Sequence, residues 1–174
     1  LCFSDISNDI FIGKNVKLIE KRCLKIGSKT KIHDRVKIDA LSTEGVCIGD
    51  HCVIGRNSCI EATGGLEHLG KGVKIGNRTT FCNDCFFGAA GGIEIGDDVV
   101  AGQYIRFHAE NHKYDDMTKL IKDQGVTHKG IDILNEHFEN QFSFQLDRDG
   151  SDYIYSTEKL IELKGKKYHK KLSK

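Results

Sequence analysis

A six-residue spacing of apolar residues runs through the chain from residue 6 to residue 112 and limits the folds that it can adopt. Fifteen six-residue units open on an apolar residue and fall into five groups of three, and extra residues enter only after the third unit of a group. The opening residues are Ile6, Ile12, Leu18, Ile26, Ile32, Ile38, Ile48, Ile54, Ile60, Ile75, Phe81, Phe87, Ile95, Ala101 and Phe107. A fixed period over this length indicates a repeat protein whose units stack on their neighbours.

Each unit has the length of one short strand and a turn. Gly occupies the second position of eight units, and the fifth position favours small or β-branched residues. The first, third and fifth residues of a strand share a face, so the apolar first and small fifth residues can point inward together. Three units per group then give three flat faces, and successive groups pair in parallel. The pattern predicts an all-β fold, a triangular parallel solenoid of five coils with its insertions at one corner.

A sandwich of short strands joined by Gly turns is the alternative fold. Sandwich strands recur at longer, irregular intervals and reverse direction, which this pattern does not do. A helix is disfavoured because each unit carries Gly or β-branched residues. The chain has 19 Gly and no Pro, so we expect its turns to be made by Gly, Asn and Asp.

The composition bears on partners and on location. A net charge of +1 gives no indication of a nucleic-acid partner. No apolar run reaches the roughly 18 residues of a membrane span, and the acidic start of the chain is unlike a signal peptide. Seven cysteines at irregular spacings argue against a disulfide framework and for a reducing compartment. We therefore expect a cytoplasmic protein without a membrane span.

The repeat breaks at its fifteenth unit, Phe107-His108-Ala109-Glu110-Asn111-His112. His108 stands where Gly usually stands, His112 closes the unit, and the pattern then stops for about twenty residues. Long connections of this kind are usually lids or binding loops, so residues 108–131 are the candidate active-site loop. Within them, Asp115, Asp116 and Thr118 are expected to cap a short helical turn that Gly125 ends.

The repeats resemble those of the hexapeptide-repeat acyltransferases, which fold as left-handed parallel β-helices, and the resemblance covers residues 6–133. The segment 107–116, with Gln124-Gly125-Val126 and Lys129-Gly130-Ile131, resembles the sugar and polysaccharide O-acetyltransferase branch. This resemblance implies acetyl-CoA as the acyl donor, a sugar, nucleotide-sugar or polysaccharide acceptor, and a homotrimer.

The same resemblance assigns roles to single residues. His112 falls at the position of the general base, and a neutral imidazole is available for that role near pH 7. His108 is the second candidate, and Glu110 or Asp115 are candidates to orient the imidazole or to contact the substrate. Tyr114 is expected to line the acceptor pocket. Asn83 is a candidate acceptor ligand, although the family carries its Asn one position earlier, where this chain has Cys82.

A metal site is the competing interpretation of the two histidines. His108 and His112 have the spacing of two helix-borne zinc ligands, but the preceding residues follow the strand pattern, and Ala109 stands where that motif needs Glu. Zinc carbonic anhydrases of the gamma class share the β-helix and use three histidines from neighbouring coils. No histidine occupies the matching position of the coil before, so we predict no metal.

The pattern restarts at Ile131-Asp132-Ile133. It does not continue into residues 134–174. Residues 142–146 and 153–155 alternate like two strands, residues 147–150 form a predicted turn, and residues 157–164 are expected to be helical. This small α+β tail resembles a fragment of the phosphatidylglycerol lysyltransferase-like C-terminal domain. We expect it, or the loop, to cover the open end of the solenoid, with Phe142, Phe144 or Leu146 as its apolar contacts.

Two functional classes follow. The first is an acetyl-CoA-dependent O-acetyltransferase with histidine as its base. The second is a truncated or chimeric remnant, a non-catalytic β-helix or binding module, because family members build much of their acyl-CoA groove from coils after the catalytic loop. A gamma-class zinc protein is the remaining alternative.

Overall fold

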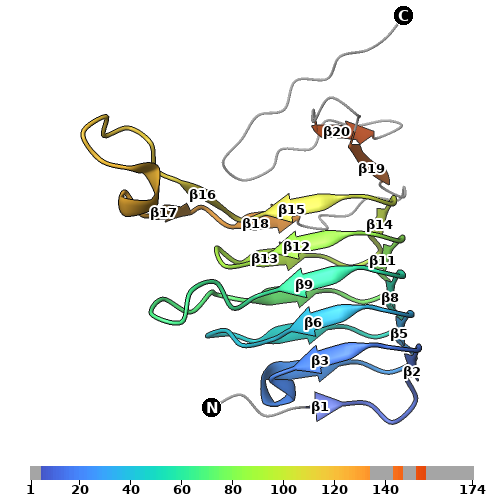
Figure 1. Ribbon diagram of the computed structural model, residues 1–174. Coiled ribbons are helices and arrows are strands. Elements are labelled where there is room, and N and C mark those ends of the chain that lie inside the picture. The colour runs from blue at the N-terminus through green and yellow to red at the C-terminus, as the bar shows by residue number, and fades with distance from the viewer. Residues whose placement is uncertain (1–4, 134–142, 147–151, 156–174) are drawn as a thin grey trace, which may run out of the picture.

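The computed structural model describes residues 5–133, 143–146 and 152–155, and it is built almost entirely of short strands (Figure 1). Sheet A contains β1 (Asp5–Ile6), β4 (Leu24–Ile26), β7 (Val46–Ile48), β10 (Val73–Ile75), β13 (Ile93–Ile95) and β18 (Ile131–Ile133). Sheet B contains β2 (Phe11–Ile12), β5 (Lys31–Ile32), β8 (Val53–Ile54), β11 (Thr80–Phe81) and β14 (Val100–Ala101). Sheet C contains β3 (Lys17–Ile19), β6 (Lys37–Asp39), β9 (Cys59–Glu61), β12 (Phe86–Gly88) and β15 (Arg106–His108).

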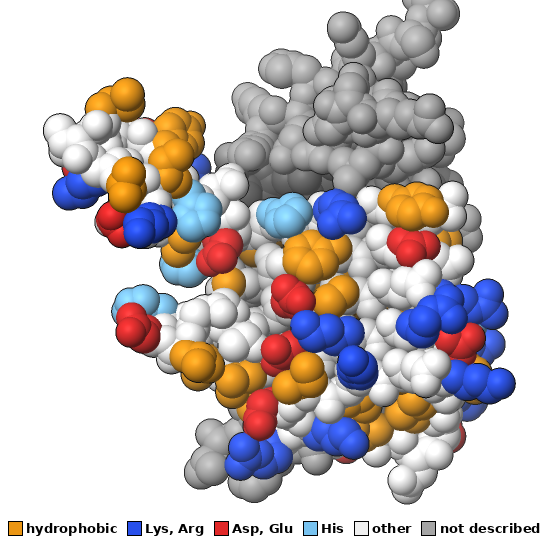
Figure 2. Space-filling view, in the orientation of Figure 1, with side chains coloured by type: hydrophobic (Ala, Val, Ile, Leu, Met, Phe, Trp, Pro, Cys, Tyr) orange, Lys and Arg blue, Asp and Glu red, His pale blue; other side chains and the backbone are white. Residues whose placement is uncertain are grey.

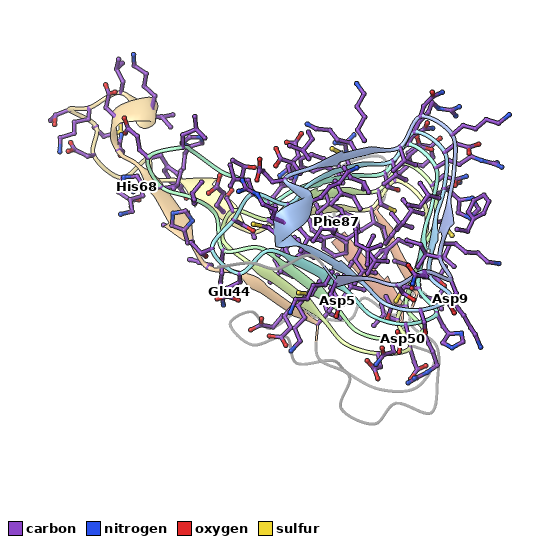
Figure 3. The ribbon with its side chains drawn as sticks, turned by 90° about the horizontal axis from the view of Figure 1, so that it is seen from below. Asp5, Asp9, Glu44, Asp50, His68 and Phe87 are labelled. Atoms are coloured by element: carbon purple, nitrogen blue, oxygen red, sulfur yellow. The ribbon has the colours of Figure 1, made fainter. Side chains whose placement is uncertain are left out.

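Each coil contributes one strand to each sheet, and all strand pairs within the three sheets are parallel. Seen along the stack, the coils superimpose as a triangle with Phe87 inside, while Glu44 and His68 lie on segments that project at one corner (Figure 3). Residues 40–45, 62–72, 89–92 and 109–130 all connect sheet C to sheet A. The prediction of a parallel triangular solenoid with insertions at one corner is confirmed.

The inward positions of the repeat form one core. Ile54 and Ile95 are 0% and 1% exposed, as the six-residue spacing predicts. Phe81 packs edge-on against Phe87, with ring centroids 4.8 Å apart, and the next coil places Ala101 directly beside Phe81 in the sheet. A small residue beside a large one keeps the interior filled without widening the coil.

Glycine in the second position of a unit is required by the stacking of the coils. A Cβ added at Gly55 would lie 2.3 Å from the carbonyl oxygen of Cys82 in the next coil, which is closer than any real contact. The fourth position adopts a positive φ, as at His51 with φ 56° and Asn57 with φ 59°. The turn of each unit therefore combines a close backbone approach with one left-handed residue.

The small residues of the fifth position hydrogen-bond along the stack. The Thr30 hydroxyl donates to the Gly49 carbonyl oxygen at 2.7 Å and accepts the Cys52 N–H at 3.0 Å. In the next coil the Cys52 thiol donates to the Gly76 carbonyl oxygen at 2.9 Å. Cys52 and Cys85, which both occupy the fifth position of their units, are buried.

Cys82 and Cys85 should differ in thiol reactivity because one is exposed and the other is buried. This difference gives a direct test of the coil geometry. Desolvation raises the pKa of Cys85 to about 11, so little thiolate exists at pH 8, whereas Cys82 is exposed on the surface. Brief treatment of the native protein with iodoacetamide should label Cys82 and leave Cys85 unmodified, and both should react in guanidinium. Peptide mass spectrometry measures the two sites in one sample. Equal labelling in the native protein would show that Cys85 does not face inward.

The chain returns to sheet A after the candidate loop. β18 pairs in parallel with β13, and Ile133 is buried at 6% exposure, so the predicted restart of the pattern at residues 131–133 is confirmed. Beyond it, β19 (Ser143–Leu146) and β20 (Asp152–Tyr155) form an antiparallel pair where two strands were predicted. The predicted turn at 147–150, the helix at 157–164 and the contact from Phe142 lie outside the described residues.

β19 lies beside β14, the last strand of sheet B, as a cap on the open end requires. Removing residues 134–174 should therefore expose the edge of β14, lowering Tm by several degrees or causing aggregation. Thermal unfolding and light scattering of the full and shortened chains measure both effects. A shortened chain that stays monodisperse at an unchanged Tm would mean that the tail does not protect this edge.

Candidate functional site

The segment after the fifth coil forms a projecting β-hairpin, here called the arm (residues 110–128) (Figure 1). β16 (Glu110–His112) pairs antiparallel with β17 (Val126–His128). The arm leaves the body at the corner between sheets C and A, directly after β15. The candidate active-site loop is thus ordered by pairing at its base.

The tip of the arm is closed by its own side chains. The Gln124 amide accepts the Asp116 N–H at 3.0 Å and donates to the Asp116 and Lys119 carbonyl oxygens. A short 3₁₀ helix, η2 (Ile121–Asp123), occupies the predicted place, and Gly125 follows with a φ of +77°. The predicted side-chain cap is wrong, because Asp116 instead accepts the Thr118 N–H and no side chain caps η2.

One face of the arm carries Glu110, His112 and His128. In the hairpin register Glu110 lies opposite His128, and His112 lies opposite Val126, so alternation places all four side chains on the same face. His128 Nδ1 lies 3.4 Å from Glu110 Oε2, and the two side chains are 47% and 36% exposed. The ring of His112 is exposed, with no protein hydrogen bond or ion pair among the described residues.

His108 lies on the outer face of sheet C, next to the base of the arm. Its ring packs at a tilt against Phe86, with centroids 5.3 Å apart, and its neighbour in the sheet is Gly88. Figure 2 shows histidine side chains (pale blue) at the base of the arm, on the adjoining end of sheet C and on the insertion below, around a notch between these parts. Figure 3 places His68 on that insertion.

The other predicted site residues lie in two places. Tyr114, 71% exposed, and Asp115 project from the arm. Asn83 sits at the corner between sheets B and C, across the width of sheet C from the arm, and its side-chain oxygen accepts the Arg56 N–H at 2.9 Å. The structure therefore brings Glu110 and His112 onto one surface, with His108 on the adjacent strand, and leaves Asn83 in a structural turn.

His128 was not among the residues singled out in the sequence. Its pairing with Glu110 spans 18 positions, and no spacing rule connects the two before the hairpin is known. The available signal was the β-branched run around Val126 and Thr127, followed by Gly130, which could have indicated a strand returning to the coil.

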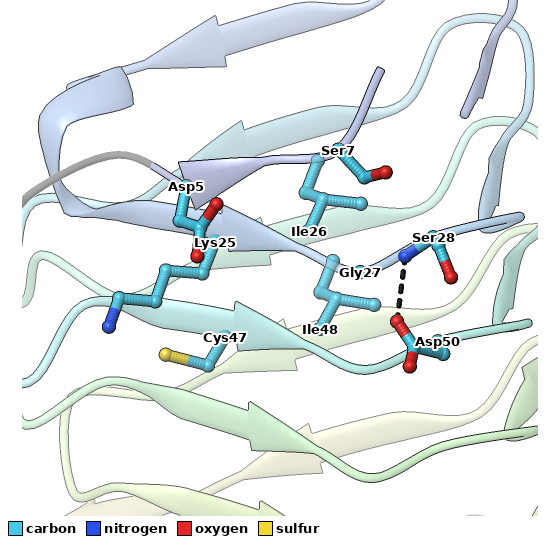
Figure 4. A pocket seen from close by; sticks show the side chains of 9 residues that line it. All are labelled: Asp5, Ser7, Lys25, Ile26, Gly27, Ser28, Cys47, Ile48 and Asp50. Atoms are coloured by element: carbon cyan, nitrogen blue, oxygen red, sulfur yellow. Dashed lines mark hydrogen bonds between the residues drawn. The ribbon is translucent and has the colours of Figure 1, made fainter. Parts of the chain in front are cut away.

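A second hollow, a groove of about 460 Å³, lies on sheet A near the N-terminal end (Figure 4). Its lining includes Asp5, Lys25 and Cys47, and the Asp50 carboxylate there accepts the Ser28 N–H at 2.7 Å. The groove lies in the first three coils, whereas the arm follows the fifth, and it contains no histidine. It is therefore separate from the candidate site.

Among the described residues, no group of three or more His, Cys, Asp or Glu side chains is placed to hold a metal ion. The same part of the chain has no helix of the length and apolarity that crossing a bilayer requires. Comparison with protein-family models and with curated proteins finds no match to the chain.

Proposed function

We propose that this protein is an O-acetyltransferase that moves an acetyl group from acetyl-CoA to a hydroxyl of a sugar or polysaccharide. The observation that carries the proposal is the arm, which interrupts a three-sided parallel solenoid directly after the fifth coil and presents an exposed His112. The resemblance of the repeat and of residues 107–116 to sugar O-acetyltransferases supports it. With it we propose a left-handed coil, a homotrimer and a cytoplasmic location.

His112 acts as the general base. A sugar hydroxyl has a pKa far above 7, so it needs a proton acceptor at the moment its oxygen attacks the thioester carbon. The imidazole of His112 takes this proton as the new C–O bond forms. The C–S bond then breaks, and the proton passes to the departing coenzyme A thiolate. No described side chain forms a hydrogen bond or an ion pair with the ring of His112, so its nitrogens are available for the acceptor.

Glu110 acts on the arm rather than on His112. Its carboxylate lies beside His128 and not beside the His112 ring. Glu110 therefore pairs with His128 across the hairpin and does not orient the His112 imidazole directly. This pair ties β17 to β16 two residues from His112 and so fixes the position of the base. Tyr114 and Asp115, exposed further along the arm, are the groups available to contact the acceptor.

The proposal is tested by incubating the purified chain with acetyl-CoA and a panel of sugars and oligosaccharides. Chromatography with mass spectrometry measures free coenzyme A and the acetylated product, and it avoids interference from the protein's own thiols. Release of coenzyme A that depends on one acceptor, with a matching product, supports the activity. Absence of product with every acceptor would remove it.

A non-catalytic β-helix is the second candidate, and the tail favours it. After β18 the next described strands are the antiparallel pair β19 and β20 rather than further coil strands. In the resembling family, coils after the catalytic loop supply much of the acyl-CoA groove. Calorimetric titration with acetyl-CoA separates the candidates, because only an acetyltransferase needs to bind it.

A further inference from the structure

The outer face of sheet C carries an aromatic and cationic patch beside the candidate site, here called the sheet C patch (Phe86, Arg106 and His108). The Phe86 ring is half-buried, and the Arg106 guanidinium carbon lies 5.9 Å from its centroid. The His108 ring is packed on the same phenyl group at 5.3 Å. Figure 2 shows this area as an open face of the solenoid next to the arm.

A glycine lies beneath the two rings of the patch. Gly88 lies in the sheet directly beside His108, and a Cβ there would come within 3.1 Å of the Phe86 ring and 3.5 Å of His108 Nδ1. A larger residue would therefore push the Phe86 ring aside. Both rings lie over Gly88, where no side chain separates them, with His108 exposed and Phe86 half-buried.

The charge of the patch is unbalanced. Several other cations on the solenoid have carboxylate partners, such as Lys37 with Glu61 at 2.9 Å and Arg78 with Asp98 at 2.6 Å. Arg106 has none among the described residues, and its contact there is with the Phe86 ring. A guanidinium beside an aromatic ring complements a ligand that offers both a carboxylate and a flat apolar face. A sugar acid has both, since its ring can lie on an aromatic side chain.

The patch lies at a distance from the proposed base. The four steps of chain from His108 to His112 span at most about 13 Å at the rise of a strand. This upper limit exceeds the span of a single sugar ring. A ligand that lies on the patch and reaches His112 therefore has room for more than one sugar.

We infer that the acceptor is an acidic oligosaccharide or polysaccharide, one of whose uronic acid residues binds the sheet C patch. Its ring lies on Phe86, and its carboxylate pairs with Arg106. The inference rests on the proposed function for the link to His112, while binding to the patch stands apart from catalysis.

Binding is measured without acetyl-CoA, by titrating the full chain with tetragalacturonate and with neutral maltotetraose. We expect the acidic tetramer to bind at least tenfold more tightly. Arg106→Gln should weaken its binding about tenfold, since it removes a charge-assisted contact, and this loss should shrink at high salt. Phe86→Ala should weaken it at all salt concentrations. Lys17→Gln, which removes an exposed cation from the same row of sheet C in the first coil, is the matched control and should change little.

Equal binding of the two tetramers, no binding of either, or equal losses in the Lys17 and Arg106 variants would overturn the inference. A loss of acetyl-CoA affinity in Arg106→Gln with unchanged glycan binding would reassign the patch to the phosphates of the donor. Thermal melts separate a binding defect from unfolding in Phe86→Ala. If that variant is unstable, Arg106→Gln still tests the inference, because Arg106 is exposed and its replacement does not disturb the core. If the glycan binds as expected but no acceptor is acetylated, the proposed function fails and the patch stands.

Discussion

Replacing His112 by asparagine should lower kcat by about 10²- to 10⁴-fold while leaving acetyl-CoA affinity nearly unchanged, because this range is typical for loss of a positioned general base. Asparagine keeps hydrogen-bonding capacity but cannot take the proton of the attacking hydroxyl. Turnover is measured from the acetylated sugar, and donor affinity by titration. His108→Ala should cost less, because the His108 ring packs on Phe86.

The chain offers a matched control for this variant. His51 is also exposed, and it sits at a turn with a φ of 56°, a conformation that asparagine accepts readily. His51→Asn makes the same chemical change away from the arm and should leave kcat unaltered. Near-normal turnover in His112→Asn would remove the base role from His112. If His128→Asn then abolished activity, the base would be His128, held by Glu110.

The second large effect is on the free energy of unfolding. It is tested by making the same substitution at the same repeat position in two different coils. Ile54 and Ile12 both open the second unit of a coil, but Ile54 is fully buried and Ile12 is 45% exposed. Ile54→Ala should cost about 2–5 kcal/mol, because the cavity forms between Ile32 and Phe81 in the neighbouring coils. Ile12→Ala should cost well under half as much.

Urea unfolding followed by far-ultraviolet circular dichroism gives both values on the same scale. Similar losses at the two positions would mean that the first coil is covered as fully as the third. A small loss at Ile54 would mean that the interior relaxes around the missing atoms, contrary to the close packing expected of a stacked core.

The repeat made the solenoid predictable from the sequence. Ile54 and Ile95 open six-residue units, and both point into the core as the repeat predicts. The extra residues lie at a corner of the triangle, where they do not interrupt a strand. The return of the chain to sheet A at Ile131 and Ile133 followed from the same pattern. In each case the six-residue spacing of apolar residues occurs many times, so one irregular unit did not hide the pattern.

The arm was less predictable because it has no period. The position of η2 followed from local turn chemistry, but the cap did not, since the Asp116 carboxylate accepts the Thr118 N–H instead. The partner of Glu110 depends on the hairpin register, which a one-residue shift would change completely. Asn83 was considered for the acceptor, and its turn position gives its side-chain oxygen a backbone partner in Arg56.

The stacking of the coils has a consequence for how the protein can vary. Each coil pairs only with the coils directly before and after it, and the first coil and the arm lie at opposite ends of the stack. Stability in such a chain is close to a sum of nearest-neighbour terms, so a disturbance decays along the axis instead of spreading through a shared interior. Mutations that accumulate in the partly exposed first coil are thermodynamically insulated from the surface that carries His112. The two ends of this molecule can therefore evolve at independent rates.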